Sequence, residues 1–116
     1  MPAPIVVVHD DPEFMRSLTQ ALGGYDVATF DHPDAAFEAL KVANSVEVLV
    51  TRVAFADTQP VGLSLARLAR VKCPGVRVIF TARPEYRAYI EGDGVFLPLT
   101  ATVGEVVDAV VRLGAG

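Results

Sequence analysis

Apolar residues along this 116-residue chain form short continuous runs that alternate with longer amphipathic stretches. Continuous apolar runs are typical of strands buried on both faces of a sheet, whereas spacings of three and four residues are typical of helices packed against it. The runs predict five strands, which are Ile5–Val8, Tyr25–Phe30, Val46–Val50, Val76–Phe80 and Val95–Leu97. The spacing predicts helices that begin near Pro12, Pro33, Leu63 and Val103, and the stretch 81–94 leaves room for about two more helical turns.

This alternation predicts an α/β fold in which helices cover both faces of an open parallel sheet, as a single domain over residues 1–116. The apolar content of 52% and mean hydropathy of +0.40 suit a sheet that is covered on both sides. The uncharged apolar runs are too short to span a membrane. The lone cysteine, Cys73, excludes an internal disulfide and suits a reducing cytoplasm, and the net charge of −4 argues against nonspecific nucleic-acid binding.

Ligand sites in such sheets lie beyond the carboxyl ends of the strands, so the residues there are the candidates for function. "HDD" (9–11) follows the first strand, "TR" (51–52) the third, "TA" (81–82) the fourth and "PLT" (98–100) the fifth. The third strand therefore ends on a threonine and an arginine. No acidic residue occurs between Glu47 and Asp57.

Four segments in order, "IVVVHDDPEF", "VLVTRV", "VRVIFTA" and "GVFLPLTATVGEVVDAV", carry a resemblance over essentially the full chain. The chain resembles the receiver (CheY-like) domains of two-component response regulators. The resemblance implies a flavodoxin-like (βα)5 fold, a doubly wound five-stranded parallel sheet in the order 2-1-3-4-5, here with a shortened fourth helix. It also implies a signalling role.

In that family an aspartate at the end of the third strand becomes an acyl phosphate, and an acidic pair helps to hold Mg²⁺. By resemblance, Asp10 matches the second acidic position, whereas His9 occupies the first. Arg52 stands where the phosphoacceptor aspartate belongs. Neutral imidazole is a poor ligand for Mg²⁺, and arginine cannot accept the phosphoryl group. The sequence therefore predicts a degenerate phosphorylation site, with no metal and no cofactor.

The other matched positions are divided between retained and replaced residues. Thr81 retains the threonine that grips the phosphoryl oxygens, and Phe96 matches the aromatic switch position. Leu99 replaces the lysine. The degenerate pocket is thus predicted to comprise His9, Asp10, Asp11, Arg52, Thr81 and Leu99.

Arg52 has two interpretations. Its guanidinium could replace the metal by pairing with Asp10 and Asp11, since arginine supplies a permanent charge, or it could point into solvent. His9 likewise could be a pH sensor whose pKa the neighbouring carboxylates raise, or a hydrogen-bonded residue at a strand end.

These observations predict an atypical receiver, or pseudo-receiver, that acts as a phosphorylation-independent protein-interaction module in two-component-type signalling, and not an enzyme. Expected partners are a histidine kinase or another signalling protein, with a homodimer possible, in the cytoplasm, and neither nucleic acid nor membrane. One alternative is noncanonical phosphorylation at Asp57 or Asp10. Another is a flavodoxin-like enzyme or small-ligand-binding domain, although the loop "HDDPEF" would repel a phosphate-bearing cofactor.

Overall fold

The computed structural model describes residues 4–42, 45–55, 61–90 and 92–114. Strands and helices alternate along it, as the apolar pattern predicts. The elements are β1 (Ile5–Val8), α1 (Pro12–Ala21), β2 (Val27–Phe30), α2 (Pro33–Lys41), β3 (Val48–Arg52), α3 (Gly62–Lys72), β4 (Arg77–Ala82), a 3₁₀ turn (Pro84–Tyr86), α4 (Arg87–Ile90), β5 (Val95–Pro98) and α5 (Val103–Gly114).

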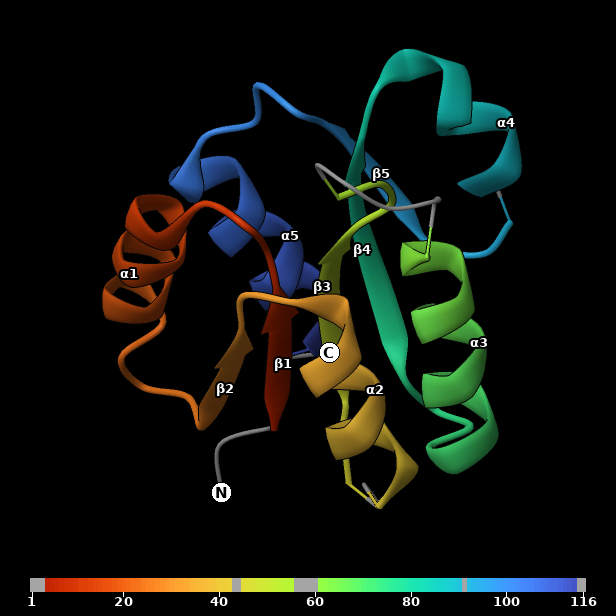
Figure 1. Cartoon of the computed structure of the whole chain (residues 1–116). Helices are drawn as coiled ribbons and strands as arrows, with labels where there is room; N and C mark the ends of the chain where they lie inside the picture. The colour runs from red at the N-terminus through yellow and green to blue at the C-terminus, as the bar shows by residue number, and fades with distance from the viewer. Residues whose placement is uncertain (1–3, 43–44, 56–60, 91, 115–116) are drawn as a thin grey trace.

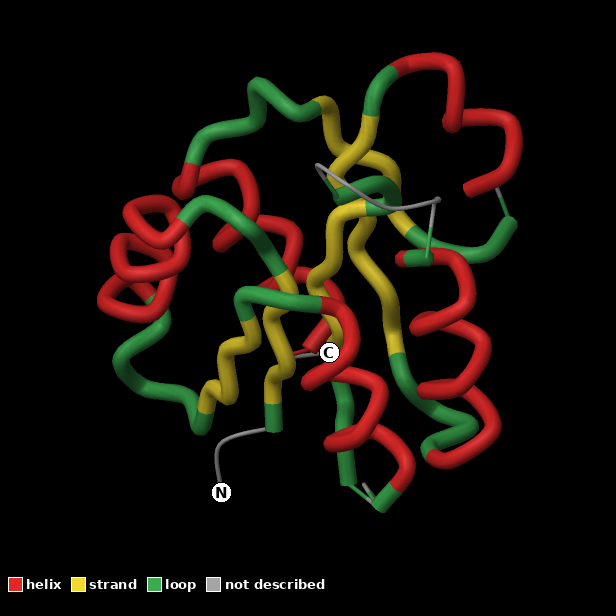
Figure 2. Tube along the Cα trace, viewed as in Figure 1, coloured by secondary structure: helices red, strands yellow, loops and turns green. Residues whose placement is uncertain are grey.

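The strands form one sheet in the order β2-β1-β3-β4-β5, and every neighbouring pair is parallel (Figures 1 and 2). This order confirms the predicted flavodoxin-like fold. Because the strands are parallel, their carboxyl ends meet at one edge of the sheet, the upper edge in Figure 1. That edge is where the polar residues predicted to matter are brought together.

Helices cover both faces of the sheet, with α1 beside α5 on one face and α2 beside α3 on the other (Figure 1). The continuous apolar strands divide between two cores because successive side chains point to opposite faces. In β1, Ile5 and Val7 join the core under α1 and α5, whereas Val6 and Val8 join the core under α2 and α3. No helix in the described ranges is long and apolar enough to cross a membrane.

The two central strands run two residues further at their carboxyl ends than the apolar pattern predicts. β3 continues through Thr51 and Arg52, and β4 continues through Thr81 and Ala82. Arg52 pairs with Thr81 across the two strands, and this pairing keeps both residues in the sheet. The apolar pattern placed the ends of these strands earlier because these residues are polar. Arg52 is therefore the last residue of a strand rather than part of a loop.

Two other segments can be compared with the prediction from the sequence. The segment after β4 forms the 3₁₀ turn and the short α4, which confirms the predicted shortened fourth helix. Residues 25–26 precede β2 instead of belonging to it.

Glycine 62 fixes the start of α3 against the end of β3. Its N–H donates to the Val53 carbonyl at 2.9 Å. A Cβ built on Gly62 would overlap the Arg52 carbonyl oxygen and lie 2.7 Å from the Val53 Cα. Only glycine allows this approach of the two backbones without a shift.

Candidate functional site

Arg52 and Asp10 form an ion pair across the carboxyl ends of two adjacent strands. The Arg52 Nη1 donates to the Asp10 Oδ1 at 2.5 Å, and the two side chains are only 23% and 25% exposed. The parallel register that pairs Val8 with Thr51 carries the residues that follow them to the same edge. Arg52 thus lies against a carboxylate, as the metal-replacement hypothesis predicts, and does not extend into solvent.

Asp11 does not join this pair, so that part of the hypothesis is wrong. Its Oδ1 accepts hydrogen bonds from the N–H groups of Glu13 and Phe14, at 3.0 Å and 3.3 Å. Asp11 is thus the N-cap of α1, which begins at Pro12 as the sequence predicts. Asp11 is exposed, and its carboxylate satisfies helix donors rather than a cation.

His9 directly follows β1 and is half-buried, with its side chain 12% exposed. Its Nδ1 accepts the Asp11 N–H at 3.0 Å, and its ring stacks on Phe14 at a centroid distance of 4.7 Å. Only a neutral imidazole offers that acceptor.

Burial lowers the pKa of His9, and the positive charge of Arg52 lowers it further. Asp10 and Asp11 raise the pKa of His9, but by less. The expected rise in pKa is therefore wrong in sign, because it considered the carboxylates without the cost of desolvation. The hydrogen-bonded strand-end interpretation of His9 is the one that the contacts favour.

Two buried polar atoms beside the ion pair have no hydrogen-bond partner within the described ranges. They are the Nε of Arg52 and the Oγ1 of Thr81. Thr81 is only 3% exposed and lies directly opposite Arg52 in the sheet. By contrast, the Oγ1 of Thr51 donates to the Arg52 carbonyl at 2.8 Å. Buried polar groups in folded proteins are nearly always hydrogen-bonded to protein or to ordered water, so these two atoms set this edge apart from the paired groups around it.

A cavity of about 200 Å³ opens next to these atoms. It is lined by Arg52, Ala54, Phe55, Ala82, Arg83, Tyr86 and Leu99. Leu99, at the predicted lysine position, is 41% exposed at this cavity. Sequence reasoning missed Arg83 and Tyr86, although "RPEY" (83–86) directly follows the fourth strand and so had to lie at the same edge.

Phe96 lies on β5, beyond the cavity. It is half-buried, and the Arg87 guanidinium carbon is 5.3 Å from its ring centroid. This cation–π contact holds the ring at the α4 side of the sheet.

The residues present do not fit the Mg²⁺ site that receiver domains imply. Magnesium binds carboxylate oxygen, but Asp10 is paired with Arg52, Asp11 caps a helix, and His9 offers nitrogen. Within the described ranges, no three His, Cys, Asp or Glu side chains group together so that they could hold a metal ion. Asp57, the alternative phosphoacceptor, lies outside the described residues.

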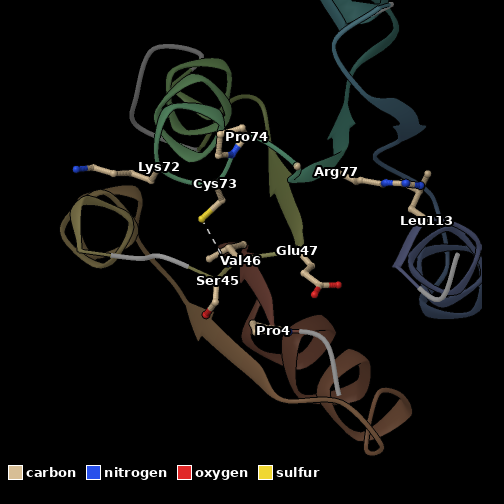
Figure 3. A pocket seen from close by; sticks show the side chains of 10 residues that line it. Pro4, Ser45, Val46, Glu47, Lys72, Cys73, Pro74, Arg77 and Leu113 are labelled. Carbon is tan, nitrogen blue, oxygen red and sulfur yellow. Dashed lines mark hydrogen bonds between the residues drawn. The ribbon is translucent and has the colours of Figure 1, made fainter. Parts of the chain in front are cut away.

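A second cavity, of about 560 Å³, lies at the opposite, amino-terminal edge of the sheet (Figure 3). There the buried Cys73 thiol accepts the Val46 N–H at 3.4 Å, while Lys72 extends away from the thiol. The sequence places four basic residues, Arg67, Arg70, Lys72 and Arg77, around α3 and the start of β4. Arg67, Lys72 and Arg77 are exposed and Arg70 is half-buried, so most of this cluster is a solvated face.

Neither a protein-family model nor a curated protein sequence matches the chain. Solved structures do match it along almost its whole length. A response regulator receiver protein from Sinorhizobium medicae WSM419 has a TM-score of 0.82 and 20% identity, covering 97% of this chain and 94% of its own. The chain has the receiver-domain fold.

Two further solved structures are similar to this chain along most of their length. The response regulator TrrA from Thermotoga maritima, in complex with Mg²⁺-BeF, has a TM-score of 0.76 and 20% identity over 96% of this chain and 98% of its own. An adenylate cyclase structure from Rhodopirellula baltica has a TM-score of 0.80 and 18% identity over 97% of this chain and 87% of its own. At these identities the likeness establishes the receiver fold, and function has to be argued from the site.

Proposed function

We propose that this domain is an atypical receiver, a pseudo-receiver, that works in two-component-type signalling as a protein-interaction module without a phosphorylation cycle. The observation that carries the proposal is the Arg52–Asp10 ion pair, at 2.5 Å, at the end of β3. The resemblance in sequence assigns that position to the phosphoacceptor aspartate. A guanidinium cannot become an acyl phosphate, and here it occupies a carboxylate that would otherwise bind the metal.

Two further residues support the loss of phosphoryl transfer. Leu99 has no ammonium group to hold a phosphoryl oxygen, and the half-buried His9 accepts the Asp11 N–H at its Nδ1. The same reasoning makes the domain a non-enzyme that needs no cofactor. Arg52 supplies to Asp10 the positive charge that a metal supplies in a phosphorylatable site.

A surface on the α4 side supports the protein-binding part of the proposal. Tyr89 is 67% exposed, and its ring lies 6.5 Å from that of Tyr86. Tyrosine and arginine are enriched in the centres of protein interfaces, and Arg87 lies between these two tyrosines in the sequence. A histidine kinase or another signalling protein of the cytoplasm, or a second copy of the chain, is the partner that this function requires.

The decisive test is an amide NMR titration of the full chain with Mg²⁺ and beryllofluoride, the probe present in the similar TrrA structure. For the wild type we expect no saturable shifts at Asp10, Arg52 or Thr81. The Arg52→Asp variant should gain Mg²⁺-dependent shifts at Asp10, because it restores two neighbouring carboxylates. Saturable wild-type shifts converging on those three residues would overturn the proposal.

Intact mass after incubation with a small phosphodonor such as acetyl phosphate provides a second readout. The unmodified mass is expected for the wild type. A phosphoryl adduct would point instead to the noncanonical modification at Asp57 or Asp10, and Asp57→Asn and Asp10→Asn would locate it.

A further inference from the structure

The segment that runs from α3 to the start of β4 is basic, although the protein as a whole is acidic. The chain has 14 acidic and 10 basic residues, yet residues 62–77 hold four of the basic residues and none of the acidic ones. These four are Arg67, Arg70, Lys72 and Arg77. None of them forms an ion pair with an acidic side chain in the described ranges. Their charge is therefore available to a partner of opposite sign.

The cavity at the amino-terminal edge, of about 560 Å³, is lined by two of these cations. Lys72 comes from the end of α3 and Arg77 from the start of β4, and their side chains extend in opposite directions (Figure 3). Glu47 is the only acidic residue among the described residues that line the cavity. Val46 and Leu113 contribute apolar lining. The volume lies within the roughly 300–1,000 Å³ that is typical of ligand sites, so an apolar side chain of a partner has room to enter.

Apolar side chains are also exposed near this edge. Val42 is 82% exposed and Val71 is 75% exposed, more than any other large apolar side chain in the described part of the chain. Val42 directly follows α2, and Val71 lies in the last turn of α3, a helix that packs against α2. Exposed apolar groups that are surrounded by polar residues are typical of surfaces that bind proteins.

A short protein segment fits this surface better than a wide polyanion such as a membrane or a nucleic acid. All 14 acidic residues lie outside residues 62–77, and a wide negative surface would face many of them as well. The protein measures 36 × 29 × 26 Å, whereas charges are screened over about 8 Å at physiological salt. A short acidic segment can therefore contact the basic edge while most of the repelling carboxylates lie beyond the screening length.

We propose that the amino-terminal edge docks a short acidic segment of a partner protein, with one apolar side chain in the cavity and carboxylates paired with Lys72 and Arg77. The charges and the apolar lining of the edge both match such a segment. The proposal goes beyond the pseudo-receiver function and does not rest on it, because it involves neither the Arg52–Asp10 pair nor α4.

The test is an amide NMR titration of the ¹⁵N-labelled full chain at pH 7 with the end-blocked peptide Glu-Glu-Leu-Glu-Glu. We expect saturable shifts at the amides of residues 45–47 and 72–77, which surround the cavity. Replacing the leucine of the peptide by serine should weaken binding about tenfold, because an apolar side chain is no longer buried. The peptide Lys-Lys-Leu-Lys-Lys should cause no saturable shift.

Variants of the protein test the role of the two cations. Lys72→Gln and Arg77→Gln should each weaken binding of the acidic peptide about threefold, as expected for the loss of one exposed ion pair. The matched control is Arg83→Gln, an equally exposed arginine at the carboxyl edge, which should leave binding unchanged. Because all three side chains are exposed, the variants are expected to fold, and the spectrum of each one verifies this.

Four results would overturn the docking proposal. They are the absence of saturable shifts with the acidic peptide, equal affinity for the leucine and serine peptides, an affinity that neither Lys72→Gln nor Arg77→Gln changes, and shifts centred on the carboxyl edge. Shifts of the same amides that depend on protein concentration without any peptide would identify a second copy of the chain as the occupant instead. Sedimentation of the wild type, but not of Arg77→Gln, with phosphatidylserine vesicles would identify a membrane.

Discussion

The two edges of the sheet each carry a cavity, and the two cavities differ in how the polar groups around them are paired. The amino-terminal cavity measures about 560 Å³ against about 200 Å³ at the carboxyl edge. Yet backbone groups around the larger one are paired: Val46 N–H with the Cys73 thiol, and Arg77 N–H with the Glu47 carbonyl at 2.9 Å. At the carboxyl edge two buried polar atoms lack partners in the described part of the chain. Buried polar atoms without a described partner, rather than cavity volume, distinguish the carboxyl edge from the amino-terminal edge.

The largest expected difference in unfolding free energy between the two edges comes from replacing one glycine at each edge by alanine. Gly62→Ala places a Cβ on the Arg52 backbone at the carboxyl edge and should cost about 3 kcal/mol of unfolding free energy. Gly75→Ala at the amino edge meets nothing within 4 Å and should leave stability nearly unchanged. Urea unfolding of both variants measures the difference. Equal costs would contradict the close approach of α3 to β3.

A second comparison removes one arginine from each edge. Arg52→Ala should cost about 2 kcal/mol, since it removes a charge-assisted hydrogen bond between two mostly buried side chains. Arg77→Ala, an exposed arginine at the amino edge, should stay within about 0.5 kcal/mol of the wild type. Denaturant unfolding at pH 7 is the measurement. If Arg52→Ala had the same unfolding free energy as the wild type, the ion pair would contribute nothing to the stability of the fold.

A fall in pH should lower the stability of the fold through protonation of His9 at the carboxyl edge. Because the folded protein lowers the pKa of His9 below its ordinary 6.5, the unfolded state binds more protons as the pH falls below that value. The stability tied to the neutral imidazole is thus complete above pH 6.5 and lost below it, with a slope of at most about 1.4 kcal/mol per pH unit. The charges that face this ring are Asp10, Asp11 and Arg52.

Unfolding free energies between about pH 7 and pH 5.5 test this linkage. His9→Asn keeps a side-chain acceptor for the Asp11 N–H but does not titrate there, so its profile should be flatter than that of the wild type. A wild-type stability that rises as the pH falls through this range would contradict the lowered pKa.

The smallest expected effect is a gain in stability. Thr81→Val removes a buried hydroxyl that has no described partner and should stabilise the fold by about 1 kcal/mol. Thr51→Val removes a hydroxyl that donates to the Arg52 carbonyl and should destabilise by a similar amount. Thermal unfolding of both compares like with like, since both threonines are buried at neighbouring strand ends. Loss of stability in both variants would mean that the Thr81 hydroxyl is satisfied.

The order of the elements could be predicted because continuous apolar strands and capped amphipathic helices each leave a local signal. Asp11-Pro12 marks the start of α1. In α5, Val106 and Val110 are spaced four residues apart, and both are buried. The ends of β3 and β4 could not be predicted. Arg52 and Thr81 belong to the sheet because β3 and β4 pair with each other. This pairing depends on the whole fold and leaves no signal in either segment alone.

The candidate site was predictable only in part for the same reason. The Arg52–Asp10 contact follows once two parallel strands are adjacent, so the resemblance made it foreseeable. The lowered pKa of His9 depends on burial against Phe14, which no spacing argument quantifies. Arg83 directly follows β4 and so had to lie at this edge, but its place in the cavity wall beside Tyr86 depends on the 3₁₀ turn that begins at Pro84, which left no clear signal in the sequence.

The hydrogen bond between Gly62 and Val53, at 2.9 Å, also makes this fold a usable scaffold for engineering. It joins the two ends of the connection between β3 and α3 through backbone atoms alone, so the anchorage is independent of the side chains in between. Extra residues there would cost mainly loop-closure entropy, about 0.6 kcal/mol for each doubling of length. A recognition peptide or reporter inserted in this connection would therefore be held at both ends by a backbone hydrogen bond between the start of α3 and the residue that follows β3.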